Sequence, residues 1–348
     1  MLTIRDMDED DELRVSVIGA GSIGCYIGGR LADAGARVNL VGRARVGREI
    51  EAHGLTLTDY RGAEIHVAPG VAAFDTEPHA AARADVVLVT VKSAATREVG
   101  KELRAVLPNG ALVVSFQNGI GNAAVLRDEL PGRTVLTGMV PFNVLSRGEG
   151  RFHQGSSGDL EVERNPRLDR LLPAFARAGL PLLPRGDMVE VQWAKLLLNL
   201  NNPINALSNL PLRDELSSRA YRRCLALAQR EALSLLAAAG IAPARLTKVP
   251  ARWIPTLLGL PDPLFRRAAA PMLAIDPLAR SSMWEDLEAG RRTEIDWING
   301  EVVRLAEGLG RRAPVNARLV ALIRAAEEGA RRAFSGEALL AELRASLG

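Results

Sequence analysis

The chain is poor in the residues that build covalently cross-linked or metal-stabilised scaffolds. Only two of its 348 residues are cysteines and only four are histidines. Two cysteines cannot form a disulfide framework, and no histidine has the spacing of a zinc site or a catalytic triad. No apolar run approaches the roughly 18 residues that a membrane-spanning helix requires. We therefore expect neither a disulfide-rich secreted protein, nor a metal centre, nor a membrane protein.

An excess of one charge is also missing, because 44 basic residues face 41 acidic ones and the net charge is only +3. Without a dense basic run, no nucleic-acid partner is expected. The first twelve residues carry six acids, whereas a secretory signal is basic and then apolar. This pattern predicts a disordered tail over residues 1–12 and a cytoplasmic protein.

Lysine is scarce as well. Only Lys92, Lys101, Lys195 and Lys248 are lysines, so the other 40 of the 44 basic residues are arginines. An arginine keeps its proton over the usable pH range, whereas a lysine amine can be tuned to release one. Each lysine is therefore a candidate for proton transfer, with chance retention in an arginine-rich composition as the alternative.

Apolar strands alternate with helical patterns in the first half of the chain. We expect strands at residues 13–18, 37–41, 85–91 and 111–116, with helices ending near Ala34 and spanning residues 94–106. This alternation predicts an α/β domain over residues 13–186, in which helices cover both faces of a parallel sheet.

From about Asp187 onwards, apolar residues recur every three or four positions. This spacing predicts an all-α second domain over residues 187–348, with helices at residues 189–200, 217–239, 281–308 and 316–332. Six prolines between residues 245 and 280 exclude one long helix there. We expect an irregular segment or short broken helices packed on the second domain.

A glycine-rich loop follows the first predicted strand and opens the first helix, with the sequence Gly19-Ala20-Gly21-Ser22-Ile23-Gly24. In this setting Gly19 permits a tight turn, Gly21 lets the backbone approach a pyrophosphate, and Gly24 lets the helix pack closely on the strand. The loop therefore predicts a dinucleotide site, with a purely structural turn as the alternative.

The second strand ends without the acidic residue that would bind the ribose 2′-hydroxyl of NAD. Arg43 and Arg45 follow it instead. An arginine at this point suits a 2′-phosphate, so we expect NADP(H), with Arg43 as the main contact and Arg45 as a helper. Solvated surface arginines are the alternative.

Polar residues also follow the next two strands. Lys92 comes directly after one of them, and Asn118 lies in a Gln-Asn-Gly turn after the other. Ligands of open parallel sheets bind beyond the carboxyl ends of the strands, so both residues are candidates for cofactor or substrate contact. The alternatives are a surface lysine and a turn asparagine.

In the helical half, Lys195 and Asn199 are four residues apart, so they project from one face of a leucine-rich helix. Burial there would lower the pKa of a lysine and suit it to proton donation near neutral pH. A lysine that extends to solvent is the alternative. Asn202 and Asn205 flank Pro203 and are either ligand contacts or helix caps.

A second cluster, SSMWEDLEAGRRTEIDWING, begins at Ser281. Its helix would present Glu294 to a pocket, although a carboxylate on a helix surface is the common alternative. Arg291 and Arg292 are interpreted as ion-pair partners or as part of a solvated face.

These motifs together resemble the ketopantoate reductase family. The resemblance rests on VIGAGSIG, VKS, QNG, WAKLLLN, the cluster from Ser281, and APVN at residues 313–316, in that order. It implies a Rossmann domain and a helical domain with the active site in the cleft between them. It also implies NADPH-dependent reduction of 2-dehydropantoate (ketopantoate), a small 2-oxo acid, to pantoate in pantothenate biosynthesis.

The resemblance implies roles for single residues. Lys195 matches the family's proton donor and Glu294 its active-site glutamate, while Asn199 and Ser282 match substrate-binding positions. Arg43, Lys92 and Asn118 match the cofactor-side contacts. The family's second asparagine, eight residues after the lysine, is replaced here by Pro203, with Asn202 beside it as the candidate substitute.

Three functions are compatible with this pattern. Beside ketopantoate reduction, a related enzyme would reduce a different 2-oxo acid, and a non-catalytic protein would merely sense NADP(H). The sensor would need neither Lys195 nor Glu294. Trp284 and Trp297 on the helical domain make a homodimer a further expectation.

Overall fold

The computed structural model describes residues 12–269, 279–330 and 332–347. The chain divides into two compact units, Met1–Met188 and Val189–Gly348. Most of the predicted acidic tail lies outside the described residues, except Glu12, which pairs with Arg37 at 3.4 Å.

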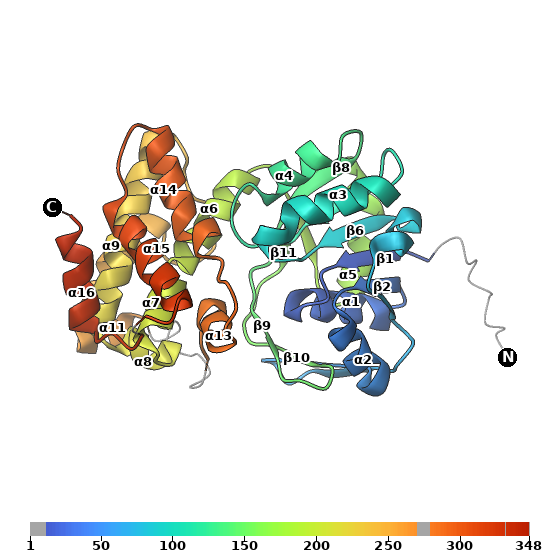
Figure 1. Ribbon diagram of the computed structural model, residues 1–348, viewed down its shortest axis with the longest axis horizontal. Coiled ribbons are helices and arrows are strands. Elements are labelled where there is room, and N and C mark those ends of the chain that lie inside the picture. The colour runs from blue at the N-terminus through green and yellow to red at the C-terminus, as the bar shows by residue number, and fades with distance from the viewer. Residues whose placement is uncertain (1–11, 270–278, 331, 348) are drawn as a thin grey trace. The chain divides into compact units, whose positions relative to one another are not determined.

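An eight-stranded sheet forms the centre of the first unit, in the order β12-β11-β8-β7-β6-β1-β2-β5 (Figure 1). Neighbouring strands are parallel, except β8 and β11, which are antiparallel. The predicted parallel sheet is thus confirmed. The strands are β1 (Arg14–Ile18), β2 (Arg37–Val41), β5 (Ala73–Asp75), β6 (Val86–Val89), β7 (Leu112–Ser115), β8 (Thr134–Met139), β11 (Leu160–Glu163) and β12 (Leu182–Arg185).

Both faces of this sheet are buried, because alternate side chains of a strand point to opposite faces. In β6, Val86 and Leu88 join one hydrophobic core while Val87 and Val89 join the other. The first core takes α1 (Ser22–Asp33) and α5 (Leu172–Arg177), and the second takes α3 (Thr96–Val106) and α4 (Asn122–Glu129). The remaining helical segments are α2 (Ala44–His53), η1 (Pro78–Arg83), η2 (Ser93–Ala95) and η3 (Pro166–Arg170).

A second, four-stranded sheet was not predicted. It has the order β4-β3-β10-β9 and packs against α1. Its strands are β3 (Leu55–Asp59), β4 (Glu64–Val67), β9 (Val144–Ser146) and β10 (Arg151–Gln154). The parallel pair of β3 and β10 joins residues about 95 positions apart. Such short strands owe their stability to distant partners, which local periodicity does not reveal.

The second unit is helical, with no strand among its described residues. The longest helix, α9, contacts α7, α8, α10, α14, α15 and α16. The helices are α6 (Met188–Asn199), α7 (Asn202–Ser208), α8 (Leu212–Ser217), α9 (Arg219–Ala238), η4 (Ala251–Trp253), α10 (Ile254–Leu258), α11 (Asp262–Ala268), α13 (Ser282–Glu288), η5 (Ile295–Trp297), α14 (Asn299–Gly308), α15 (Pro314–Glu327) and α16 (Gly336–Ala345).

The prediction of one helix over residues 281–308 is wrong. α13 ends at Glu288, and Gly290 has a φ of +62°, a left-handed conformation that closes a helix. The amide of Arg291 then donates to the carbonyl of Asp286 at 2.8 Å, which satisfies one of the free carbonyls of the last turn. A loop and η5 follow before α14 begins.

The proline-rich segment forms short helices, as expected. Pro255 and Pro263 lie in the first turns of α10 and α11, where a missing N–H does no harm. The fully buried Arg222 of α9 donates to the carbonyls of Leu258 and Leu260 at 3.1 and 2.9 Å, so the segment packs on the helical unit. Residues 270–278, with Pro271 and Pro277, lie outside the described residues.

Candidate active site

The glycine loop is packed where it joins the sheet and open where a ligand would lie. Gly19 has a φ of +112°, and a Cβ there would lie 2.7 Å from the amide nitrogen of Val91. A Cβ at Gly24 would lie 2.2 Å from the carbonyl oxygen of Gly19. By contrast, a Cβ at Gly21 would meet no atom within 4 Å. Gly19 and Gly24 therefore allow the loop and α1 to pack closely on the neighbouring backbone. Gly21 leaves the backbone on the outer surface of the loop uncovered by any side chain.

The same loop begins α1, and no acidic side chain at the start of this helix would compete with a bound phosphate. Gly21 is the N-cap residue and makes no side-chain cap, and the first turn holds no acidic side chain. The amides of Ser22, Ile23 and Gly24 have no acceptor among the described residues, as is normal for the start of a helix. Exposed N–H groups and the helix dipole attract phosphate, so the loop fits a dinucleotide pyrophosphate.

Arg43 lies beside this loop. It follows β2 as the N-cap residue of α2, and a Cβ at the preceding Gly42 would lie 2.7 Å from that of Ala20. Its exposed guanidinium has no hydrogen-bond or ion-pair partner in the described part of the chain. Arg45, in contrast, pairs with Glu49 at 2.6 Å. The structure therefore leaves Arg43 rather than Arg45 available to an anion.

Lys92 and Asn118 are both exposed and follow β6 and β7 at the same carboxyl edge of the sheet. Buried amides beneath them join the two loops. Gln117 Nε2 donates to the carbonyl of Val91 at 3.0 Å, and Asn122 Nδ2 donates to Ser93 Oγ at 3.0 Å. The loops that carry both candidates are thus held in fixed positions.

Sequence reasoning missed these supporting residues. Ser93, Thr96, Ser115, Gln117 and Asn122 are all at most 8% exposed and bond to one another. Their signal was present as polar residues directly after two buried strands, where only Lys92 and Asn118 were singled out. Their role is to position the loops.

In the second unit, Lys195 and Asn199 lie one turn apart on α6. Lys195 is partly buried, and burial lowers the pKa of its amine to about 8. Flanking side chains such as Trp193 and Leu196 are at most 5% exposed. A lysine whose pKa is lowered by burial is suited to proton transfer.

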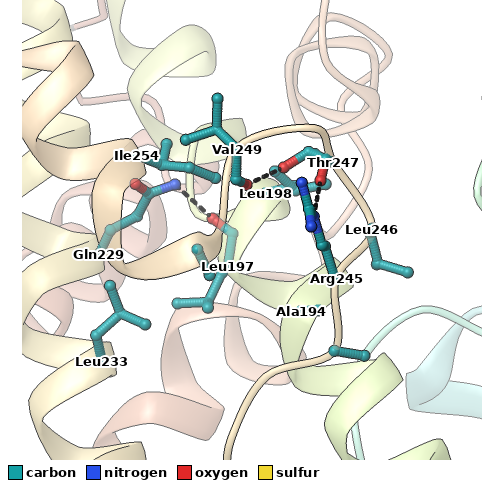
Figure 2. Close-up of a pocket in the computed structure, with 12 residues that line it drawn as sticks. Ala194, Leu197, Leu198, Gln229, Leu233, Arg245, Leu246, Thr247, Val249 and Ile254 are labelled. Atoms are coloured by element: carbon teal, nitrogen blue, oxygen red, sulfur yellow. Dashed lines mark hydrogen bonds between the residues drawn. The ribbon is translucent and has the colours of Figure 1, made fainter.

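α6 ends here because Pro203 has no N–H to donate to the carbonyl of Asn199. The carbonyl of Leu197, near the end of the helix, accepts a 3.0 Å bond from Gln229 Nε2 of α9 instead (Figure 2). Gln229 thus caps α6 from another helix and helps to fix the turn that carries Asn199.

A pocket lies between α6, α9 and the segment that follows α9. It is lined by Ala194, Leu197 and Leu198 of α6, by Gln229 of α9, and by residues between Ala244 and Ile254 (Figure 2). Its volume is only about 20 Å³, which is room for one water molecule. The buried Gln229 Oε1 at this pocket has no partner among the described residues. The pocket is too small for a substrate and belongs to the support of α6.

Asn202 is the first residue of α7, and its carbonyl accepts a 3.2 Å bond from Ser281 Oγ. The same hydroxyl caps α13 by accepting the amide of Trp284 at 3.2 Å. Ser282, the exposed first residue of α13, therefore lies next to a contact of Asn202. The helix-cap alternative is wrong for Asn202 and Asn205, because Asn201 is the N-cap residue and Asn205 lies inside α7.

Glu294 is partly buried in the loop before η5, not on a helix. Arg291 pairs with Asp286 at 3.0 Å and Arg292 with Glu327 at 2.7 Å, so their predicted role as ion-pair partners is confirmed. Glu327 also accepts the amide of Thr293 at 2.7 Å. These bonds hold the loop that carries Glu294.

Among the described residues, no group of three or more histidine, cysteine, aspartate or glutamate side chains is arranged to hold a metal ion. No helix in the same part of the chain has both the length and the apolar character to cross a membrane.

Comparison with known proteins assigns the chain to a family. The ketopantoate reductase PanE/ApbA model matches residues 15–167, and the model of that family's C-terminal part matches residues 187–327. A 2-dehydropantoate 2-reductase of Halobacterium salinarum is 28% identical, over 90% of this chain and 99% of its own length.

Solved structures agree. A PanE/ApbA family ketopantoate reductase from Ralstonia eutropha is 31% identical and has a TM-score of 0.77, covering 91% of this chain and 99% of its own. A D-mandelate dehydrogenase in complex with NADH and anilino(oxo)acetate, 19% identical with a TM-score of 0.74 and covering 91% and 99%, shares the fold. The chain therefore belongs to the PanE/ApbA ketopantoate reductase family and is an oxidoreductase of the type that acts on a CH–OH group.

Proposed function

We propose that this chain reduces 2-dehydropantoate (ketopantoate) to pantoate with NADPH, a step of pantothenate biosynthesis. The observation that carries the proposal is Lys195. Reduction of a ketone requires a proton for the carbonyl oxygen, and a lysine whose pKa burial has lowered to about 8 can supply one near neutral pH.

The first unit would bind the cofactor, as the dinucleotide-binding domain over residues 13–186. Gly19, Ala20, Gly21, Ser22, Ile23 and Gly24 form the loop for the pyrophosphate. Arg43 would pair with the 2′-phosphate, because its guanidinium is available beside that loop and can bind phosphate through two parallel hydrogen bonds. Lys92 and Asn118 would contact the cofactor or the substrate from the same edge of the sheet. When bound, NADPH supplies the hydride.

The second unit, residues 187–348, would supply the acid. At pH 7 most Lys195 side chains carry a proton, because the pKa of about 8 lies above the ambient pH. Lys195 would donate a hydrogen bond to the carbonyl oxygen at C2 of the substrate and pass its proton to that oxygen. Negative charge builds on the oxygen as the hydride arrives, so the ammonium stabilises the transition state more than the ground state.

Polar side chains would orient the substrate. Asn199, Asn202 and Ser282 offer donors for its carboxylate and hydroxyl group, and Asn118 offers another from the first unit. Glu294 would accept a hydrogen bond from a hydroxyl group. Pro203 takes the position of the family's second asparagine, so the candidate substitute Asn202 stands one residue earlier. This departure favours a different 2-oxo acid as the second candidate substrate.

The test is turnover of ketopantoate and of a panel of bulkier 2-oxo acids, followed as loss of NADPH absorbance. Lys195→Ala should lower kcat by about 10²–10⁴-fold while leaving the Kd of NADPH unchanged. Lys248→Ala, at an exposed lysine, is the matched control and should behave as wild type. Near-wild-type kcat in Lys195→Ala would refute the assignment, and NADPH binding without turnover of any acid would favour the sensor.

We also infer a homodimer that uses the partly buried Trp284 and Trp297. Light scattering on the purified protein measures the mass directly, and a monomeric mass at micromolar concentration contradicts this inference.

A further inference from the structure

A buried carboxyl group lies outside the set of residues that the proposed reaction uses. Glu215 of α8 is fully buried. No cation pairs with it among the described residues. An ionised carboxylate in such a place is strongly disfavoured unless it is paired.

The hydrogen bonds of Glu215 indicate where a proton is needed. Its Oε2 accepts Nδ2 of Asn201 at 3.2 Å and Nδ2 of Asn205 at 2.9 Å. Its Oε1 has no partner, and neither has Oδ1 of Asn201, although both atoms are buried. Two orphaned acceptors on groups that are already bonded to each other lack one donor. A proton on Oε1 would make that atom a donor, and burial raises the pKa of Glu215 to about 8, so the acid form prevails at neutral pH.

The buried cation beside α8, Arg222 of α9, is turned to other partners. Its guanidinium donates to the carbonyl of Leu216 at 2.9 Å and pairs with Asp262 at 2.7 Å. None of its hydrogen bonds among the described residues reaches Glu215.

α8 packs against α7, which contributes the two asparagine amides, and against α9. The titratable groups of α9 that interact with Glu215 are Tyr221 and Cys224, and burial raises the pKa of both, that of Cys224 to about 12. All three groups are therefore neutral at pH 7.

The asparagines connect this carboxyl to the substrate candidates. Asn205 is fully buried, and its Oδ1 accepts the amide of Ser281 at 2.9 Å. Ser281 Oγ donates in turn to the carbonyl of Asn202 at 3.2 Å. A chain of three hydrogen bonds thus runs from Glu215 through Asn205 and Ser281 to Asn202, and Ser282 follows directly on Ser281.

We propose that Glu215 is a positioning residue, a neutral carboxylic acid that fixes Asn205 and thereby holds the start of α13, with Ser282, beside Asn202. The proposal rests on the proposed function for its kinetic consequence, because Asn202 and Ser282 are substrate contacts there. Its structural part, the anchoring of Ser281, stands independently.

The experiment compares Glu215→Gln with Glu215→Ala in the full-length enzyme. Glutamine keeps one carbonyl oxygen and places an NH₂ where the acid carries its proton, so it should preserve the network and keep KM for ketopantoate within about twofold. Alanine leaves two buried amides unsatisfied and should raise that KM by about tenfold or more. Because the first unit is untouched, the Kd of NADPH should not change.

Two further measurements keep the outcomes distinct. Leu339→Ala is the control for a general loss of stability, because it also removes a buried side chain of the second unit. It lies in α16 and should leave KM for ketopantoate unchanged. Amide hydrogen exchange of the peptide that contains Ser281 and Trp284 should become faster in Glu215→Ala but not in Glu215→Gln or Leu339→Ala. This readout remains if no 2-oxo acid is turned over, in which case only the proposed function fails.

Unchanged exchange and unchanged KM in Glu215→Ala would overturn the positioning role. Equal damage from Glu215→Gln and Glu215→Ala would overturn the neutral-acid form, because only an ionised carboxylate is poorly replaced by an amide.

Discussion

At the scale of the residue, the cofactor preference is expected to depend on one guanidinium. Arg43 is exposed beside the glycine loop and has no partner in the described part of the chain, while Arg45, two residues on, is engaged by Glu49 at 2.6 Å. The two arginines therefore form a natural pair of test and control, since they share an element and differ in their availability.

Arg43→Ala should weaken NADPH binding by about 10- to 100-fold, because hydrogen bonds to charged groups contribute about 1.5–3 kcal/mol. NADH, which has no 2′-phosphate, should bind as it does to wild type. Arg45→Ala should alter neither affinity. Calorimetric titration of the three proteins measures these constants, and an intact NADPH preference in Arg43→Ala would remove Arg43 from the site.

Single residues were predictable where their chemistry is local. Lys195 was singled out as a rare lysine on an apolar helix, and its surroundings do lower its pKa. Glu215 and Gln229 were not singled out, and Asn205 was not linked to Glu215, because each depends on a partner 10 to 76 residues away. A sequence pattern carries no record of such pairs.

At the scale of the element, the glycine loop shows how one motif divides its work. Gly24 is crowded by backbone at 2.2 Å, whereas Gly21 faces open space. A methyl group should therefore damage folding at one position and ligand binding at the other.

Gly24→Ala should destabilise the protein by at least about 1–3 kcal/mol, the usual range for overpacking, and lower its Tm. Gly21→Ala should keep the Tm near wild type and weaken NADPH binding instead, because its Cβ enters the space left for the pyrophosphate. Thermal unfolding and nucleotide titration of both variants separate the two effects. A Tm loss as large in Gly21→Ala would contradict this division.

Elements with a strong local signal were predicted well. β2 has the predicted bounds of residues 37–41, and α6 lies within two residues of its prediction. The predicted helix over residues 281–308 failed, because Gly290 adopts a left-handed conformation where the apolar spacing continues. The small sheet of β3, β4, β9 and β10 was missed, since its short strands are stabilised by partners far along the chain.

At the scale of the whole molecule, Glu215 makes the stability of the fold depend on pH. Burial raises its pKa to about 8 in the folded protein, whereas a glutamate in an unfolded chain titrates near 4.3. Between these two values the unfolded chain releases the proton that the folded protein keeps. The contribution of this group to stability therefore falls as pH rises from about 4.5 to about 8 and is constant above that range.

Glu215→Gln cannot ionise, so its free energy of unfolding should rise relative to wild type as pH increases through this window, by about 1.4 kcal/mol per pH unit at most, and its Tm should rise with it. Other groups titrate equally in both proteins, so their effects cancel in the difference. Parallel Tm curves for the two proteins between pH 5 and about 9 would show that Glu215 ionises normally in the fold.

The sequence by itself determined the features that depend on local chain geometry. A glycine permits a left-handed turn, a proline removes an N–H, and β-branched runs make buried strands, so the glycine loop, the end of α6 and the parallel sheet could be read along the chain. Only the tertiary structure decided which polar groups are buried together, such as Glu215 with Asn201 and Asn205. The reason is that a pKa and an unsatisfied hydrogen bond depend on what packs around a side chain, and distant segments do that packing.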